Sequence, residues 1–300
     1  MSNVLNLISE ETYTEKMDTQ NALLKAIATK AGGGLDYPIK INSWAMVQQL
    51  VRLGVGDKVF KIGDQFICEH EVYGPLVWDV IGINQDTPAD SNYKNSLTIQ
   101  LHDCLGGETL QFDAPEPTNP DLRRSQYGSN NWACSNIRQW LNSHDAAGEW
   151  WEEKTQYDAK PSYADSMDGF LRGLDEEFLS VIGEVRKITA NNTVTDGGYS
   201  ETSTEKIFLP SITEVFGGLN NGVSEGVAYS YYSENTTLTA PGTTGDANRV
   251  RFWNGAPTYW WLRSPNTAGS FSIRYVSIDG GIGNFGANNS RGVSPVCCIV

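Results

Sequence analysis

The chain has 300 residues, of which 39% are apolar and 11% aromatic, and this composition is ample for a packed core. Its formal net charge of −14 opposes binding to nucleic acid and to anionic lipid surfaces. No apolar run approaches the roughly 20 residues that a membrane-spanning helix needs. The N-terminus also lacks the basic and apolar segments of a secretory signal. We therefore expect no nucleic acid partner, no membrane insertion, and either residence in the cytoplasm or exit by another route.

The N-terminal segment from Glu10 to Ala31 is predicted to form a helix, because apolar residues recur at alternating four- and three-residue steps, as in a coiled-coil seam. A helix of about three heptads is marginal alone in water and needs a partner. We expect residues 1–31 to be an oligomerisation or attachment stem, with a trimer as one arrangement. The alternative is a helix packed on its own domain. Residues 32–56 are predicted to be a glycine hinge and a short helix.

The remaining elements are expected to alternate between strands and short helices. They are, in chain order, a helix from Ser43 to Leu53 with Ser43 as N-cap, short strands over 58–84 and 96–105, helices over 130–143 and 165–179, a strand over 185–191, and a strand, proline break and short helix over 205–216 capped by Ser211 or Thr213. From Leu219 onward the composition predicts long loops crossed by short strands. The fold class is therefore α+β, with residues 57–300 as its main domain.

Two glycine motifs resemble catalytic or nucleotide-binding loops. Gly281, Gly283 and Gly286 have the spacing of a dinucleotide-binding fingerprint, but neither a helical pattern nor an acidic residue follows them. The segment Gly222–Gly226 matches the GxSxG pattern of serine hydrolases, yet the three histidines all precede it. Neither motif has the context that its chemistry requires.

Metal and thiol chemistry are also weakly indicated. The stretch CEHE places Cys68 and His70 on one strand face and Glu69 and Glu71 on the other, but no pair has a zinc-site spacing. We expect no metal and no cofactor. The number of cysteines is odd and no CxxC occurs, so buried free thiols are favoured over disulfides.

The segment RFWNGAPTYWWLRSP, residues 251–265, is the strongest local feature. Aromatic rings alternate there with Arg251 and Arg263. Alternation predicts that about half of the rings are buried, and an exposed half can stack on sugars or contact a protein partner.

Four segments carry a resemblance to a known family, namely NNWACSNIRQWLNS, EKIFLPSITEVF, YWWLRSP and YVSIDGGIGNFGANNSRGVSP. In this order they resemble a family of lectin-fold domains of gut bacteria and their phages, similar in fold to C-type lectins and formylglycine-generating enzymes. The segment over 63–90 also looks like one shared by phage structural proteins. The resemblance covers about residues 57–300 and implies a C-type lectin-like fold behind the N-terminal helical segment.

Some members of this fold class are variable proteins of diversity-generating retroelements, in which adenine-rich template codons become NNC codons. Such codons never encode Lys, Glu, Gln, Met or Trp, and all five are missing from Leu262 to Val300. The alternative is that Gly/Asn-rich loops avoid long side chains. The resemblance implies a variable region of about residues 266–291 in a long C-terminal loop. Its exposed ligand-binding residues would be Phe271, Ser272, Ile273, Arg274, Ile278, Gly281, Ile282, Asn284, Phe285 and Arg291.

A buried scaffold would hold this face in place. We assign it to Trp253, Tyr259, Trp260, Trp261 and Arg263, with Leu262 beside them and Asp279 as a further internal polar anchor. Calcium-dependent sugar binding is disfavoured, because Gly255 stands where such lectins carry a carboxylate. Oxidase chemistry is disfavoured, because Cys297 and Cys298 are adjacent rather than separated and would point to opposite strand faces.

Together these observations predict a non-enzymatic binding protein for a protein or glycan receptor on a cell surface, carried on a phage virion as an oligomer or attached to the particle. The alternative binding version is a bacterial surface protein. A purely structural virion protein is another alternative, which predicts Phe271, Ile273 and Phe285 buried against neighbouring subunits. The enzymatic alternative is a cysteine-dependent oxidase.

Overall fold

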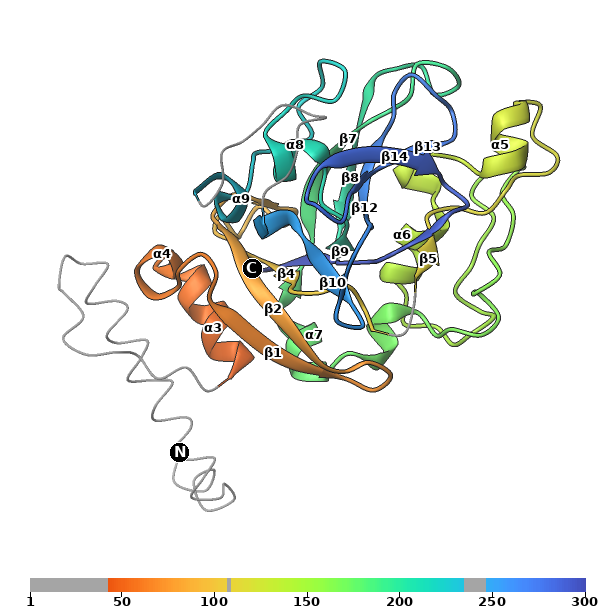
Figure 1. Ribbon diagram of the computed structural model, residues 1–300. Helices are drawn as coiled ribbons and strands as arrows, with labels where there is room; N and C mark the ends of the chain where they lie inside the picture. Colours follow the sequence, from red (N-terminus) through yellow and green to blue (C-terminus); the bar gives the residue numbers. More distant parts are fainter. Residues whose placement is uncertain (1–42, 107–108, 235–246) are drawn as a thin grey trace, which may run out of the picture.

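The computed structural model describes residues 43–106, 109–234 and 247–300 (Figure 1). The predicted stem helix from Glu10 to Ala31 and the glycines that follow it lie outside the described residues. No helix in the described ranges is both long and apolar enough to cross a membrane.

The first described helix, α3 (Trp44–Arg52), confirms the predicted helix and its cap. Ser43 Oγ accepts a hydrogen bond of 3.2 Å from the backbone N–H of Met46. Gly54 takes a positive φ of 70° immediately beyond the helix. The ring of Trp44 lies 4.6 Å from that of Phe178. The helix therefore packs into the same core as the later segments, and the short α4 (Gly56–Val59) follows it.

The main sheet is antiparallel and has the order β1-β2-β4-β16-β6, with β9 also paired to β16 (Figure 1). Its strands are β1 (Gln65–His70), β2 (Gly74–Ile83), β4 (Leu97–Leu101), β16 (Val296–Ile299), β6 (Ile182–Gly183) and β9 (Ile207–Phe208). Every residue of β4 and of β16 is buried. Strands covered on both faces lose the apolar–polar alternation, which explains the continuous apolar run at the C-terminus.

Within the described residues, four smaller antiparallel sheets accompany the main one. They are β12-β13-β14 (Trp260–Pro265, Ser272–Val276, Ile282–Gly286), β3-β7-β8 (Thr87–Pro88, Val185–Ala190, Ser200–Glu205), β10-β11 (Arg251–Trp253, Ala256–Thr258) and β15-β5 (Ser290–Arg291, Leu110–Gln111). Strand β12 packs against β7, and its Arg263 donates to the carbonyl of Ile188 in β7. The structure is mixed α+β, as predicted.

The other helices are short. They are α5 (Leu122–Tyr127), η1 (Trp132–Cys134), α6 (Asn136–Leu141), η2 (Phe170–Gly173), α7 (Glu176–Val181), α8 (Ile212–Phe216), α9 (Ser230–Glu234) and η3 (Ala247–Arg249). The helix predicted over 130–143 is divided into η1 and α6 by the extended Ser135, and α6 buries Ile137, Trp140 and Leu141, as predicted. Helix α8 begins with a full capping box between Ser211 and Glu214, which decides between the two predicted caps.

The single helix predicted over 165–179 is wrong. Turns occupy its first part, and η2 and α7 follow as separate pieces. A Cβ on Gly169 would lie 2.4 Å from the carbonyl oxygen of Ser143, and one on Gly173 would lie 2.2 Å from Cε1 of His70. The segment is therefore shaped by close contacts with distant backbone and side chains. Asp175 then caps α7 by accepting from the N–H of Phe178.

A fully buried charge cluster joins β12 to α8 and β7. Arg263 is 0% exposed and makes a bidentate ion pair with Glu214. Its guanidinium also donates to the carbonyls of Leu209, Ile188 and Glu225. Burial raises the pKa of Glu214, but Arg263 and then Lys187 outweigh it and lower that pKa to about 2. Arg263 is thus an internal anchor, as predicted.

Removing the charge at Arg263 is expected to lower the free energy of unfolding severely. Arg263→Met removes the bidentate partner of the buried Glu214 carboxylate and leaves it paired with Lys187 alone, which costs about 3–5 kcal/mol. Arg172→Met is the matched control, because Arg172 pairs with Asp168 on the surface with half of its side chain exposed. Such exposed pairs contribute about 0–1 kcal/mol. Urea unfolding followed by circular dichroism measures both, and equal losses of stability would contradict the assigned role of Arg263.

Candidate ligand-binding surface

The predicted variable region forms strands rather than a long loop. Strand β13 is the central strand of its sheet and pairs with β14 in a regular register that sets Tyr275 opposite Gly283 and Ile273 opposite Phe285. Directly opposed residues share a face of the sheet, so Ile273, Tyr275 and Phe285 lie on one face. Arg274 and Asn284 lie opposite each other on the other face.

Four partly exposed side chains form what we call the aromatic–arginine cluster: Tyr259, Tyr275, Phe285 and Arg291. The rings of Tyr275 and Phe285 stack with centroids 4.7 Å apart and an interplanar angle of 16°. Tyr259 meets the Tyr275 ring edge-on at 5.3 Å. Arg291 Cζ lies 4.0 Å from the Phe285 centroid, within cation–π range. The cluster is an ordered, partly exposed surface of rings and one cation.

Gly283 makes room for this packing. A Cβ at this position would lie 2.3 Å from the hydroxyl oxygen of Tyr275 and 2.4 Å from its Cζ. The Tyr275 ring therefore crosses directly over its cross-strand partner. This glycine belongs to the apparent nucleotide fingerprint, but it lies in an antiparallel strand, and no helix follows it in 287–300.

A second aromatic pair lies at the start of β13. Phe271 is 5.1 Å from Tyr127 at the end of α5, and Arg123 Cζ lies 5.7 Å from the Phe271 ring. The backbone N–H of Asn288 donates to the Tyr127 carbonyl over 2.9 Å, which ties α5 to the end of β14. Leu122 of the same helix is 76% exposed. This pair adds a further apolar and cationic surface to the region.

Some residues of the predicted face are not accessible. Ile273 is 0% exposed, since it belongs to the central strand, where it pairs with Phe285 on one side and Pro265 on the other. Ser272 is 4% exposed, and Gly281 is buried in a turn closed by Asp279. The expectation that these three are exposed is wrong. The other predicted residues are partly or fully exposed: Phe271, Arg274, Ile278, Ile282, Asn284, Phe285 and Arg291.

The predicted scaffold is largely as expected. Trp260, Trp261, Leu262 and Arg263 are fully buried, and both indole N–H groups donate to backbone carbonyls. Trp253 and Tyr259 are half-buried. Asp279 is not an internal anchor, because it lies in an exposed turn. Hydrogen bonds from Ser277 and from the N–H of Gly281 lower its pKa.

Sequence reasoning did not select Tyr275, Tyr127 or Arg123. Tyr275 had a usable signal, since it follows Ile273 by two residues in a strand and therefore shares its face. Tyr127 and Arg123 had none, because only the folded chain brings α5 against Phe271.

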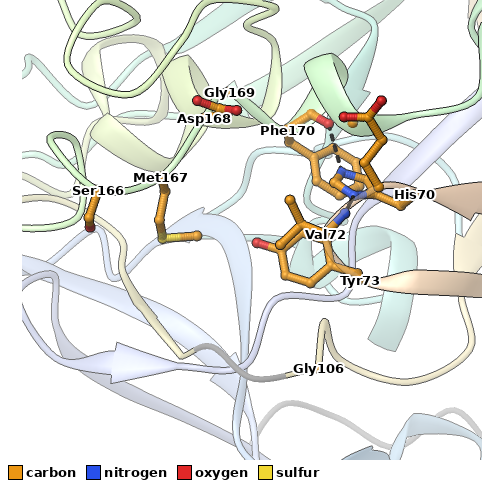
Figure 2. Close-up of a pocket in the computed structure, with 11 residues that line it drawn as sticks. His70, Val72, Tyr73, Gly106, Ser166, Met167, Asp168, Gly169 and Phe170 are labelled. Atoms are coloured by element: carbon orange, nitrogen blue, oxygen red, sulfur yellow. Dashed lines mark hydrogen bonds between the residues drawn. The ribbon is translucent and has the colours of Figure 1, made fainter.

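A separate pocket of about 390 Å³ lies between the β1–β2 turn and the segment over 166–173 (Figure 2). His70 Nδ1 accepts from the N–H of Val72, and its Nε2 donates to the Phe170 carbonyl, each over 3.1 Å. Burial lowers the pKa of His70. Figure 2 shows Tyr73 beside this ring and Met167 across the pocket. A neutral imidazole with both nitrogens engaged is not placed to transfer a proton, and no predicted site residue lines this pocket.

The residues of the other candidate motifs are not arranged as their chemistry would require. Ser224 of the GxSxG match donates to the nearby Gly226 carbonyl, and Glu225 beside it is buried. Among the described residues no group of three or more His, Cys, Asp or Glu side chains is arranged to hold a metal ion. The five cysteines are free, and all except the half-buried Cys134 are buried. Burial raises the pKa of Cys68 and Cys104 to about 12.

Gly283→Ala tests the packing of the cluster. The new methyl group would displace the Tyr275 ring, so we expect the stacked pair with Phe285 to be disrupted with little loss of global stability, because the end of one flexible side chain can move. Near-ultraviolet circular dichroism in the tyrosine region measures the change. Asn284→Ala, on the exposed opposite face of β14, is the control and should leave the spectrum unchanged. An unchanged spectrum in Gly283→Ala would contradict the assigned packing.

Comparison with known proteins identifies a matching family, which is described as a domain of unknown function. No curated protein and no solved structure matches the chain. The profile of the family described as "Domain of unknown function (DUF6273)" matches residues 109–300. The match includes the β12-β13-β14 sheet and β16, whereas β1, β2, β3 and β4 lie before it. Since it spans more than half of the sequence, the chain belongs to the DUF6273 family.

Proposed function

We propose that this chain is a ligand-binding protein of a phage virion, and that it presents a diversified surface on a C-type lectin-like domain. The observation that carries the proposal is the partly exposed aromatic–arginine cluster, because three of its four members, Tyr275, Phe285 and Arg291, lie on strands inside the region that lacks Lys, Glu, Gln, Met and Trp. Exposed aromatic rings beside arginine are enriched where proteins bind partners.

The support beneath the cluster favours this role. Trp260 and Trp261 are buried with their indole donors engaged, and Arg263 holds β12 through the buried ion pair. A binding surface on rigid strands keeps its geometry when individual exposed side chains change. Several small antiparallel sheets with short helices and long irregular segments also agree with the lectin-like resemblance.

The chemistry of the cluster suits a protein or a glycan on a cell surface. Partly exposed rings contact sugars and fill protein pockets, and the guanidiniums of Arg291 and of Arg123 in the neighbouring Phe271 pair favour partners with acceptor oxygens. Several copies on one particle would multiply weak single contacts through avidity.

The enzymatic alternative has less support. Cys297 and Cys298 are each 0% exposed. Cys298 Sγ lies 3.5 Å from Asp86 Oδ2, and burial raises the pKa of both thiols. Two thiols on opposite faces of a buried strand are poorly placed to react together. The alternative of a purely structural virion protein predicts that Phe271, Ile273 and Phe285 are buried against neighbouring subunits. Phe271 and Phe285 can still test this alternative, whereas Ile273 cannot, because it is buried within its own chain.

Nucleotide sequencing around the gene tests diversification directly. We expect a near-copy of the 3′ end that differs at adenines, beside a reverse-transcriptase gene. The altered codons should include those of Phe285, Arg291 and Asn284. A complete flanking sequence without such a copy would remove the diversification from the proposal.

Binding tests the surface itself. Fluorescently labelled chain is applied to a glycan array and to a panel of gut bacterial cells. On whichever of these the wild type binds, Phe285→Ala and Arg291→Ala should each weaken binding about 10-fold or more, as loss of a central contact does. Ile67→Ala is the control, since Ile67 is an apolar side chain that is 61% exposed on β1, which lies apart from β13 and β14 in Figure 1. Equal effects from all three variants would contradict the assigned surface.

A further inference from the structure

Lys187 is enclosed by residues from distant parts of the chain. It lies on β7, and its side chain is 2% exposed. Its Nζ contacts Asp86 Oδ1, lies 2.7 Å from Glu214 Oε1 and donates to the Tyr229 hydroxyl over 2.9 Å. The ring of Phe208 lies 4.1 Å from Nζ. A primary amine is thus held against two carboxyl groups in a site from which water is excluded.

The strand register explains why Asp86 and Lys187 meet. Strands β3 and β7 pair antiparallel, with Thr87 opposite Arg186. Continuing this register by one residue sets Asp86 opposite Lys187. The backbone itself therefore places the two side chains in contact.

The second oxygen of Asp86 is surrounded by donors. Oδ2 accepts from Thr98 Oγ1 over 2.6 Å and from the Tyr229 hydroxyl over 3.0 Å, and Cys298 Sγ lies 3.5 Å away. Donors fixed in this way around one carboxyl oxygen stabilise negative charge that develops there during attack on the carboxyl carbon.

From this arrangement we infer that Lys187 and Asp86 condense in the folded chain to form an intramolecular isopeptide bond, with Glu214 moving the protons. The step begins with transfer of a proton from the Lys187 ammonium to Asp86 Oδ1. The neutral amine then attacks Asp86 Cγ, and the carbonyl electron pair moves to Oδ2. Glu214 takes a proton from nitrogen and delivers it to the Oδ1 hydroxyl. The C–Oδ1 bond breaks and one water leaves.

The electrostatics of the site determine the protonation state from which the condensation starts and favour the condensed product. Burial opposes charge on Lys187, but Asp86 and Glu214 outweigh it and raise its pKa, so the reaction starts from an ion pair. Condensation removes one positive and one negative charge from a buried site, where charges are costly. Arg263 and Glu214 remain as a balanced pair. The product also keeps its partners, because the new N–H can donate to Glu214 and the new carbonyl can accept from Thr98 and Tyr229.

The bond would join two parts of the chain that the family comparison separates. Asp86 precedes the matched residues 109–300, whereas Lys187 and Glu214 lie inside them. A covalent link would therefore fasten the β1–β4 segment to the family domain, independently of what the aromatic–arginine cluster binds.

Mass spectrometry of the full chain tests the inference. Protein whose cooperative melting shows that it is folded is then denatured, reduced and digested with a protease. The peptide that carries Asp86 and the peptide that carries Lys187 should be recovered covalently joined, with a mass lower than the sum of the two peptide masses by one water. Lys160 and Asp165 provide an internal control, because they also form an ion pair but with side chains 34% and 72% exposed. Their peptides should remain unmodified. Recovery of the Asp86 and Lys187 peptides separately at their unmodified masses overturns the inference.

Two variants complete the test. Lys187→Arg keeps the cation but cannot form the bond, so the mass of this variant should equal the mass calculated from its sequence. A loss of water that persists in this variant overturns the inference, because it places the dehydration elsewhere. Should Lys187→Arg fail to fold, Asp86→Asn serves instead. It should give the same joined peptides with loss of ammonia in place of water. Separate peptides from folded Asp86→Asn would count against the inference.

Discussion

The buried ion pair between Arg263 and Glu214 is the interaction on which the arrangement of the C-terminal half depends. Arg263 belongs to β12, Glu214 to the first turn of α8, and the carbonyls that the guanidinium binds belong to three other segments. Glu214 also closes the capping box of its helix. One side chain thus fixes the start of α8, the position of β12 and the edge of β7 together.

Charges this deep are tolerated because they are balanced and fully hydrogen-bonded. The folded pKa of Glu214, about 2, lies below its ordinary 4.5, so the stability that this carboxylate contributes is present above pH 4.5 and is lost as the pH falls toward 2. Glu225, close by, behaves in the opposite way. Burial outweighs its partner Arg263 and its hydrogen bond from Ser264, so its pKa is raised. The contribution of Glu225 therefore strengthens as the pH falls.

The sequence was informative where structure is decided locally. The caps at Ser43 and Ser211, strand β7 and the apolar face of α6 all follow from neighbouring residues, and the structure confirms them. The helix predicted over 165–179 failed because Gly169 and Gly173 are shaped by Ser143 and His70. Strand β14 was expected as loop because its glycines and asparagine are poor strand formers, and pairing with β13, which itself pairs with β12, overrides that preference. Contacts such as Asp86 with Lys187 join residues too distant in sequence for any pattern to indicate.

The position of β16 in the main sheet has a consequence for folding. Its partners β4, β6 and β9 are made long before it, yet β4 and β6 are bridged only when residues 296–299 arrive. The β13–β14 hairpin is synthesised just before this strand and must fold compactly for β16 to reach its position between β4 and β6. Contacts between residues so far apart form slowly. Under the proposed function, every altered hairpin is therefore tested for foldability by the closing of the sheet before it meets any ligand.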